Sequence, residues 1–500
     1  MDHFAAFLNG FAVALDPVNL GYAFLGCLMG TVVGVLPGLG PAAGMALLIP
    51  ATFGMEPTSA IIMLAGLYYG SQYGGSTTSI LINTPGEASS VMTTLDGYQM
   101  AKNGRAGAAL AAAAIASFVA GTIAGLLLSL LAVPLSRFAL RIGPPEYFAL
   151  LLFSMASVTS LTGASLPRAA FAVFLGLTIA TVGIDLQSGT TRFTGGVPEL
   201  QDGVGFIVAA VGLFAISEVL VTLEAMAKGR TEVIGVRGSL WLTAEEWRRV
   251  RMPILRGSLI GFFKGSLPGG GTTIATILSY TLERGLSKEP KRFGTGMIEG
   301  VAGPEAANNA AATGAFVPLL ALGLPGSAST SILLGAFLIY GIQPGPELFT
   351  KNPELVWGLI DSMYVGNVIL FVLNLPLIMV FVRILYVPVG ILMPLILVVA
   401  GIGVYSLNES VFELFLALGF GVLGYAMRKT GVPIPPLVLS IILGGPLEKT
   451  LRQSMTISGG DPGILVSSTI SVVLLALCVV VFVVPFLPWT RIRAAIGGHP

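Results

Sequence analysis

The sequence predicts an all-α polytopic membrane protein with two inverted structural repeats, re-entrant hairpins, broken helices and about 11–12 membrane crossings. Three observations support this fold class. The chain has 500 residues, of which 54% are hydrophobic and 10% are charged, whereas a soluble domain carries about 25% charged residues. Apolar stretches long enough to cross a hydrocarbon core of about 30 Å recur along the chain. One Gly/Pro-rich motif also occurs twice, once in each half.

The first half consists of apolar segments that end at a basic linker. The linker carries basic residues from Lys228 to Arg256, and the positive-inside rule therefore places it in the cytoplasm. Within it, Thr243 followed by Glu246 resembles a capping box, which predicts a small interfacial helix. The apolar segments before the linker lie at about 20–49, 59–82, 106–133, 145–162, 167–185 and 204–224.

The segment after the linker, 257–282, has basic residues on both flanks. Both flanks should then be cytoplasmic, which means that the segment does not cross the membrane. Its centre, residues 267–271, reads LPGGG and interrupts any continuous helix. We therefore predict a re-entrant hairpin, with a single Pro-kinked helix as the alternative. Further apolar segments follow at about 313–340, 355–383, 385–405, 410–427, 432–446 and 464–490.

The repeated motif reads GxxxGxxxGxLPGxG at residues 26–40 and again at 257–271. A second pair aligns GGSTTSIL at 74–81 with GSASTSIL at 326–333. Because the second pair is spaced more widely than the first, we expect an insertion near 293–309 in the second half.

These features divide the chain into four predicted parts. They are a first membrane repeat at 20–224, a cytoplasmic basic linker at 225–256, a second membrane repeat at 257–446, and a final transmembrane helix with a short cytoplasmic tail at 447–500. The first hairpin has no basic flanks and is placed outside, so the two repeats have opposite orientations. Inverted repeats with broken helices near the midplane are typical of secondary transporters.

Polar groups beside the helix breaks are the candidates for substrate and ion binding. Free helix N-termini attract anions, and free carbonyl groups favour Na⁺. Hydroxyl groups can bind a carboxylate or Na⁺, although they also hold helices together or bond to their own helix. The candidates at the breaks and in the two Ser/Thr clusters are Pro37, Gly38, Gly40, Ser76, Thr77, Thr78, Ser79, Pro268, Gly269, Gly270, Gly271, Thr272, Ser327, Ser329, Thr330 and Ser331.

Three more candidates carry amide or carboxyl groups, and a fourth residue is a lysine. Glu305 lies among small residues beside Asn308 and Asn309, and an intramembrane carboxylate suggests ion coupling. The alternative is a loop exposed to water. Asn83 follows the first Ser/Thr cluster and is either a ligand or a helix C-cap. Lys264 either attracts an anionic substrate or extends to the cytoplasmic face.

The residue inventory predicts that the chain is not an enzyme. The only histidines, His3 and His499, lie at the two ends, which excludes His-based metal sites and Ser–His catalysis within the membrane. Neither a Walker motif nor HExxH occurs. The net charge of +1 gives no sign of nucleic-acid binding. We expect no cofactor and no bound metal other than Na⁺ at the hairpin tips.

The two GxLPGxG motifs, the Ser/Thr clusters, GPEAANNA at 303–310 and LGLPGS at 322–327 resemble the large membrane subunit, TctA, of the tripartite tricarboxylate transporters. The resemblance covers nearly the whole chain. It implies a multi-pass protein of the bacterial inner membrane with two partners, a small TctB-like membrane subunit and a periplasmic TctC-like substrate-binding protein. It further implies import of a tricarboxylate or related organic carboxylate with Na⁺ or H⁺. The alternative is a channel or scaffold subunit that moves no organic anion.

Overall fold

The computed structural model describes residues 3–36, 38–140, 142–161, 165–185, 188–226, 234–236, 239–267 and 271–483. Apart from one two-stranded antiparallel hairpin, the regular elements of this part of the chain are helices. The predicted all-helical class is thereby confirmed. Seven helical stretches among the described residues are long and apolar enough to cross a membrane, and five apolar helices are shorter. The predicted number of crossings is larger, because several predicted segments form short or interrupted helices.

Contacts divide the chain into two compact units. The first comprises Met1–Ala139 and Val204–Thr430, and the second comprises Leu140–Gly203 and Gly431–Pro500. The first unit therefore contains residues from both predicted repeats. The repeats remain a prediction about sequence and orientation, whereas the units describe packing.

The second unit consists of helices and the hairpin. Its helix α8 packs on α21, where the backbone of Gly176 lies against Leu437 and Ser440. Ion pairs between Arg192 and Glu448 and between Arg452 and Asp185 fix the hairpin region to α21. The elements are α7 (Pro144–Leu161), α8 (Leu166–Ala180), β1 (Gly183–Ile184), β2 (Thr191–Arg192), η4 (Pro198–Leu200), α21 (Ile434–Ile457), η8 (Pro462–Val466) and α22 (Thr469–Val483).

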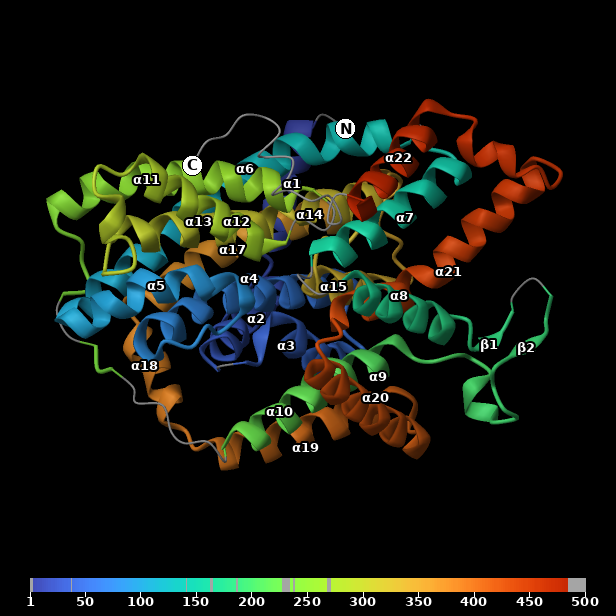
Figure 1. Ribbon diagram of the computed structural model, residues 1–500, viewed down its shortest axis with the longest axis horizontal. Helices are drawn as coiled ribbons and strands as arrows, with labels where there is room; N and C mark the ends of the chain where they lie inside the picture. The colour runs from blue at the N-terminus through green and yellow to red at the C-terminus, as the bar shows by residue number, and fades with distance from the viewer. Residues whose placement is uncertain are drawn as a thin grey trace. The chain divides into compact units, whose positions relative to one another are not determined.

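The first unit is a helical bundle, visible in Figure 1 from the blue α1 to the orange α20. Its elements are α1 (His3–Ala14), α2 (Pro17–Val35), α3 (Gly40–Leu48), η1 (Ile49–Thr52), α4 (Pro57–Ile82), η2 (Ala88–Ser90), α5 (Val91–Met100), η3 (Ala101–Arg105), α6 (Ala106–Ala139), α9 (Phe206–Ala210), η5 (Val211–Ile216), α10 (Ser217–Met226), α11 (Ala244–Gly265), α12 (Thr272–Leu286), η6 (Pro290–Arg292), α13 (Glu299–Gly314), α14 (Phe316–Leu322), α15 (Ala328–Ile339), α16 (Leu348–Lys351), α17 (Pro353–Asn374), α18 (Ile378–Val382), η7 (Arg383–Tyr386), α19 (Val389–Asn408) and α20 (Val411–Thr430).

Helix starts in this unit follow from capping residues in the sequence. Asp16 caps α2 and Glu56 caps α4, and a proline follows each cap directly. The predicted capping box of Thr243 and Glu246 is confirmed at the start of α11. This helix then continues to Gly265 without interruption. The expected small interfacial helix is therefore the first part of a longer helix, which continues past residue 256.

The Gly/Pro motif interrupts the helix at both of its occurrences. Helix α2 ends at Val35 and α3 begins at Gly40, and α11 ends at Gly265 while α12 begins at Thr272. Gly38 has φ +87° and Gly271 has φ +59°, backbone values that glycine adopts without strain. Of the motif, Pro37, Pro268, Gly269 and Gly270 lie outside the described residues.

The glycines of the first motif bring α2 against α4. A Cβ atom at Gly26, Gly30 or Gly34 would overlap a backbone oxygen of α4. Small residues permit such close approach of two helix backbones. The three glycines recur every fourth residue and therefore form one stripe along α2.

The second motif packs α11 against α13 in the same manner. Gly257, Gly261 and Gly265 lie against the backbone oxygens of Gly303, Ala307 and Ala311. The second half does contain extra residues, because Gly257 meets Gly303 whereas Gly26 meets Met63, but they lie before Gly303, so the expected range 293–309 extends too far into α13. Helix α13 begins within this range, and it packs against the glycines of α11 as α4 packs against the glycines of α2.

The turns that follow α4 and α14 also match. Asn83 (φ 55°) and Gly323 (φ 69°) both end their helices in the left-handed conformation. After each, a Pro-Gly pair leads to an N-cap residue, Glu87 or Ser327, which forms a capping box. In the structure, segment 326–330 therefore corresponds to 86–90. The alignment of 326–333 with 74–81 is wrong, because the serines of the two segments have different local structures.

Candidate substrate and ion site

Glu305 is a fully buried carboxylate in the middle of α13. Its Oε2 accepts a hydrogen bond of 2.5 Å from Ser76 on α4, and its Oε1 accepts one from the Thr93 hydroxyl on α5. Among the described residues no basic side chain forms an ion pair with it. The alternative of a loop exposed to water is therefore wrong. A buried carboxylate without a basic partner is costly, and the two hydroxyl bonds offset only part of that cost.

The two asparagines one turn later link α13 to neighbouring segments. Asn308 donates from Nδ2 to Glu87 at 2.9 Å, and its own Oδ1 is buried without a hydrogen-bond partner. Asn309 donates from Nδ2 to Ser117 on α6 at 2.6 Å and to the backbone oxygen of Glu305 at 3.3 Å. One face of α13 thus carries a carboxylate and two amides, and it is joined by hydroxyl groups from three helices, α4, α5 and α6.

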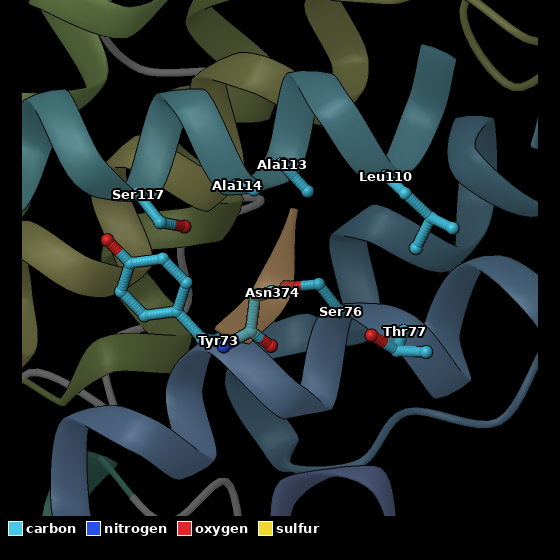
Figure 2. A pocket seen from close by; sticks show the side chains of 8 residues that line it. All are labelled: Tyr73, Ser76, Thr77, Leu110, Ala113, Ala114, Ser117 and Asn374. Carbon is cyan, nitrogen blue, oxygen red and sulfur yellow. The ribbon is translucent and has the colours of Figure 1, made fainter. Parts of the chain in front are cut away.

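A small cavity lies beside this cluster, between α4, α6 and α17 (Figure 2). Its volume of about 10 Å³ corresponds to about one water molecule. Ser76 lines this cavity and also bonds to Glu305. The residues around the cavity are Tyr73, Ser76, Thr77, Leu110, Ala113, Ala114, Ser117 and Asn374.

In the first Ser/Thr cluster, two residues face the cavity and two form hydrogen bonds to backbone oxygens. Ser76 and Thr77 face the cavity. Thr78 and Ser79 donate instead to the backbone oxygen of Gly75, at 2.9 and 3.0 Å. Thr78 is therefore bonded to its own helix, and Ser79 is bonded both to its own helix and to the backbone oxygen of Ser90 at 3.1 Å.

The second Ser/Thr cluster begins helix α15. Ser327 is its N-cap, Thr330 completes the capping box, and Ser331 donates to the backbone oxygen of Ser327 at 2.9 Å. Ser329 is buried in the first turn. These hydrogen bonds give the cluster a local structural role and do not connect it to Glu305.

The remaining predicted site residues lie at helix ends. Asn83 is the exposed C-cap of α4. Gly40 and Thr272 begin α3 and α12, and Gly271 is the N-cap of α12. Gly38 lies beside the carboxylate of Glu218, which pairs with Arg428. None of these residues contacts the Glu305 cluster in the hydrogen bonds described.

Sequence reasoning missed four residues of the site, namely Glu87, Thr93, Ser117 and Asn374. Ser117 lies in an alanine-rich stretch, and Asn374 ends a long apolar helix. Neither position carries a local motif. Glu87 could have been found from its place after a Pro-Gly pair, where Ser327 stands in the second half.

Comparison with known proteins identifies the family. The model of the tripartite tricarboxylate transporter TctA family matches residues 20–439. An uncharacterized 52.8 kDa protein in the TAR-I ttuC' 3'region of Agrobacterium vitis is 46% identical over 491 residues, which is 98% of each chain. An uncharacterized protein in the TAR-II ttuC' 3'region of the same organism is 46% identical over 235 residues, covering 47% of this chain and 96% of that protein. No solved structure matches.

The match covers most of the chain, and a membrane transporter family agrees with the seven apolar helical stretches. The chain therefore belongs to the TctA family, as a multi-pass membrane subunit of a tripartite tricarboxylate transporter in the bacterial inner membrane, and it is not an enzyme.

Proposed function

We propose that this chain is the large permease subunit that imports a tricarboxylate or related organic carboxylate together with Na⁺ or H⁺. A small TctB-like membrane subunit and a periplasmic TctC-like binding protein complete the system, and the binding protein delivers the substrate. The observation that carries the proposal is Glu305, a buried carboxylate held by hydroxyl groups and not by a basic residue. Such a group can take up and release a cation during transport.

The placement of Glu305 supports a transport role over a purely structural one. The cluster joins α4, α5 and α6 from the first predicted repeat to α13 from the second. A central site between two repeats of opposite orientation is common in transporters that work by alternating access. The two Gly-striped helix pairs, α2 with α4 and α11 with α13, support that reading.

Uptake by the complete three-part system in proteoliposomes tests the proposal. Labelled carboxylate should enter only with the binding protein present and with an inward Na⁺ or H⁺ gradient. Glu305→Gln should reduce the initial rate by about tenfold or more, equal to about 1.4 kcal/mol or more. Glu354→Gln, at an exposed carboxylate that begins α17, is the matched control and should leave the rate unchanged.

Two results would contradict the proposed transport, and a third would contradict the role of Glu305. Entry of the carboxylate without the binding protein and without an ion gradient would favour a channel. Absence of any uptake by the complete system, across a set of tri-, di- and monocarboxylates, would favour a scaffold subunit. Retention of the full rate by Glu305→Gln would remove that residue from the site.

A further inference from the structure

The cavity between α4, α6 and α17 presents oxygen atoms to its interior. Asn374 donates from Nδ2 to the backbone oxygen of Leu370 at 3.0 Å and to Thr31 at 3.3 Å. These bonds fix the amide, and its Oδ1 is buried without a hydrogen-bond partner. In Figure 2 this oxygen points to the side on which Ser76 and Thr77 lie.

Three of the hydroxyl groups around the cavity, those of Tyr73, Ser76 and Ser117, have hydrogen-bond partners outside it. Ser76 donates its proton to Glu305 at 2.5 Å, and Tyr73 donates its proton to Asn367 at 2.6 Å. Ser117 accepts a proton from Asn309. Because the protons of Ser76 and Tyr73 point elsewhere, their oxygen lone pairs remain for the cavity. A cavity lined by hydrogen-bond acceptors favours binding of a cation and disfavours binding of a carboxylate.

The volume of the cavity and the charge of the residues around it indicate which kind of cation could bind. A volume of about 10 Å³ admits one small ion and no organic molecule. Hard cations prefer oxygen ligands. Among the described residues there is no group of three or more His, Cys, Asp or Glu side chains that could hold a metal ion. The oxygens that line the cavity are neutral, and the one carboxylate next to them is that of Glu305. A monovalent cation fits this arrangement, because its single positive charge balances the charge of Glu305.

We propose that this cavity binds one Na⁺ ion, with Asn374 Oδ1 and the hydroxyl oxygens of Ser76, Thr77 and Ser117 as ligands. Glu305 supplies the compensating negative charge through its hydrogen bond to Ser76. The inference deepens the proposed transport function, on which it rests for the role of Na⁺ as coupling ion. It moves the ion from the predicted hairpin tips to the centre of the helical bundle.

Na⁺ binding to the purified full-length chain can be measured without transport. Because a ligand that binds only the folded state stabilises it, NaCl should raise the Tm in detergent relative to an equal concentration of choline chloride. In Ser117→Ala and in Asn374→Leu the half-saturating Na⁺ concentration should increase about tenfold or more, since each removes a ligand. Ser258→Ala is the matched control, because this buried serine bonds to the backbone of its own helix.

The outcomes separate the inference from the proposed function. The same Na⁺ dependence in Ser117→Ala as in the wild type and Ser258→Ala would overturn the site, as would a wild-type Tm that NaCl does not raise. If carboxylate uptake then follows a proton gradient, the transport proposal stands without the sodium site. If Na⁺ raises the Tm through Ser117 and Asn374 but no carboxylate is transported, the site stands and the transport proposal fails.

Discussion

Three buried carboxylates in the first unit have partners of different kinds. Glu283 forms a bidentate pair with Arg256, with distances of 2.7 and 2.6 Å. Asp96 is fully buried and accepts hydrogen bonds from three backbone N–H groups of the 294–297 loop and from Tyr280. Glu305 has only hydroxyl partners, which can rearrange. The first two arrangements stabilise the fold, and the third leaves a negative charge for an ion to balance.

Neighbouring hydroxyls on α4 allow a sharp comparison at the residue scale. Ser76→Ala removes the bond to Glu305, so we expect the uptake rate to fall by about tenfold. Thr78→Val removes a bond to the backbone of the same helix, and its uptake rate should stay within about twofold of the wild type. Both variants should reach the membrane in equal amounts. Equal uptake rates would show that the Ser76–Glu305 bond has no part in transport.

Asp96 gives a second prediction at this scale, on stability. Asp96→Ala leaves the N–H groups of Gly294, Gly296 and Met297 without their acceptor, so the free energy of unfolding should fall by roughly 3–5 kcal/mol. Asp461→Ala is the control, because it removes one exposed capping bond to Gly463 and should cost about 0.5–2 kcal/mol. Thermal unfolding in detergent measures both. A similar decrease in Tm for the two variants would contradict the role of Asp96.

At the scale of helices, the sequence predicted the positions of the helix breaks more accurately than it predicted which helices correspond in the two halves. The breaks at 35–40 and 265–272 follow from Pro and Gly, whose backbone preferences are local. The correspondence of α4 and α13 does not show in their sequences, because Asn308 and Asn309 of α13 stand where α4 has Tyr68 and Tyr69. What the two helices share is that the backbone of each lies in close contact with the glycines of a neighbouring helix. That feature becomes visible only when the two helices are packed together.

The glycine stripes provide a test at the element scale. A Cβ at Gly261 would overlap the backbone of Ala307, so Gly261→Ala should lower the free energy of unfolding by roughly 1–3 kcal/mol. Gly30→Ala should do the same between α2 and α4. Gly285 lies in α12 with open space around it, so Gly285→Ala should stabilise by up to about 1 kcal/mol. A Tm that rises in all three variants would show that the helix pairs have room between them.

For the whole molecule, composition and the recurring apolar segments were enough to predict a polytopic helical protein. The polar centre was predicted only in part. Glu305, Asn308 and Asn309 stand out in sequence, because polar groups are rare among small residues. Ser117 and Asn374 reach the same region from distant helices, and a contact between distant segments leaves no local pattern. The orientation of the repeats rests on the distribution of Lys and Arg alone.

That orientation is testable by labelling single cysteines in intact cells with a membrane-impermeant maleimide. Cys27 and Cys478 are first replaced by alanine. Ala51→Cys lies just after the first predicted Gly/Pro hairpin and Lys288→Cys just after the second, and both positions are exposed. Under the inverted arrangement, position 51 should be labelled from the periplasm and position 288 only after the inner membrane is permeabilised. Labelling of both positions from the same side would mean that the repeats are parallel, and the proposed central site would then lose the symmetry on which alternating access depends.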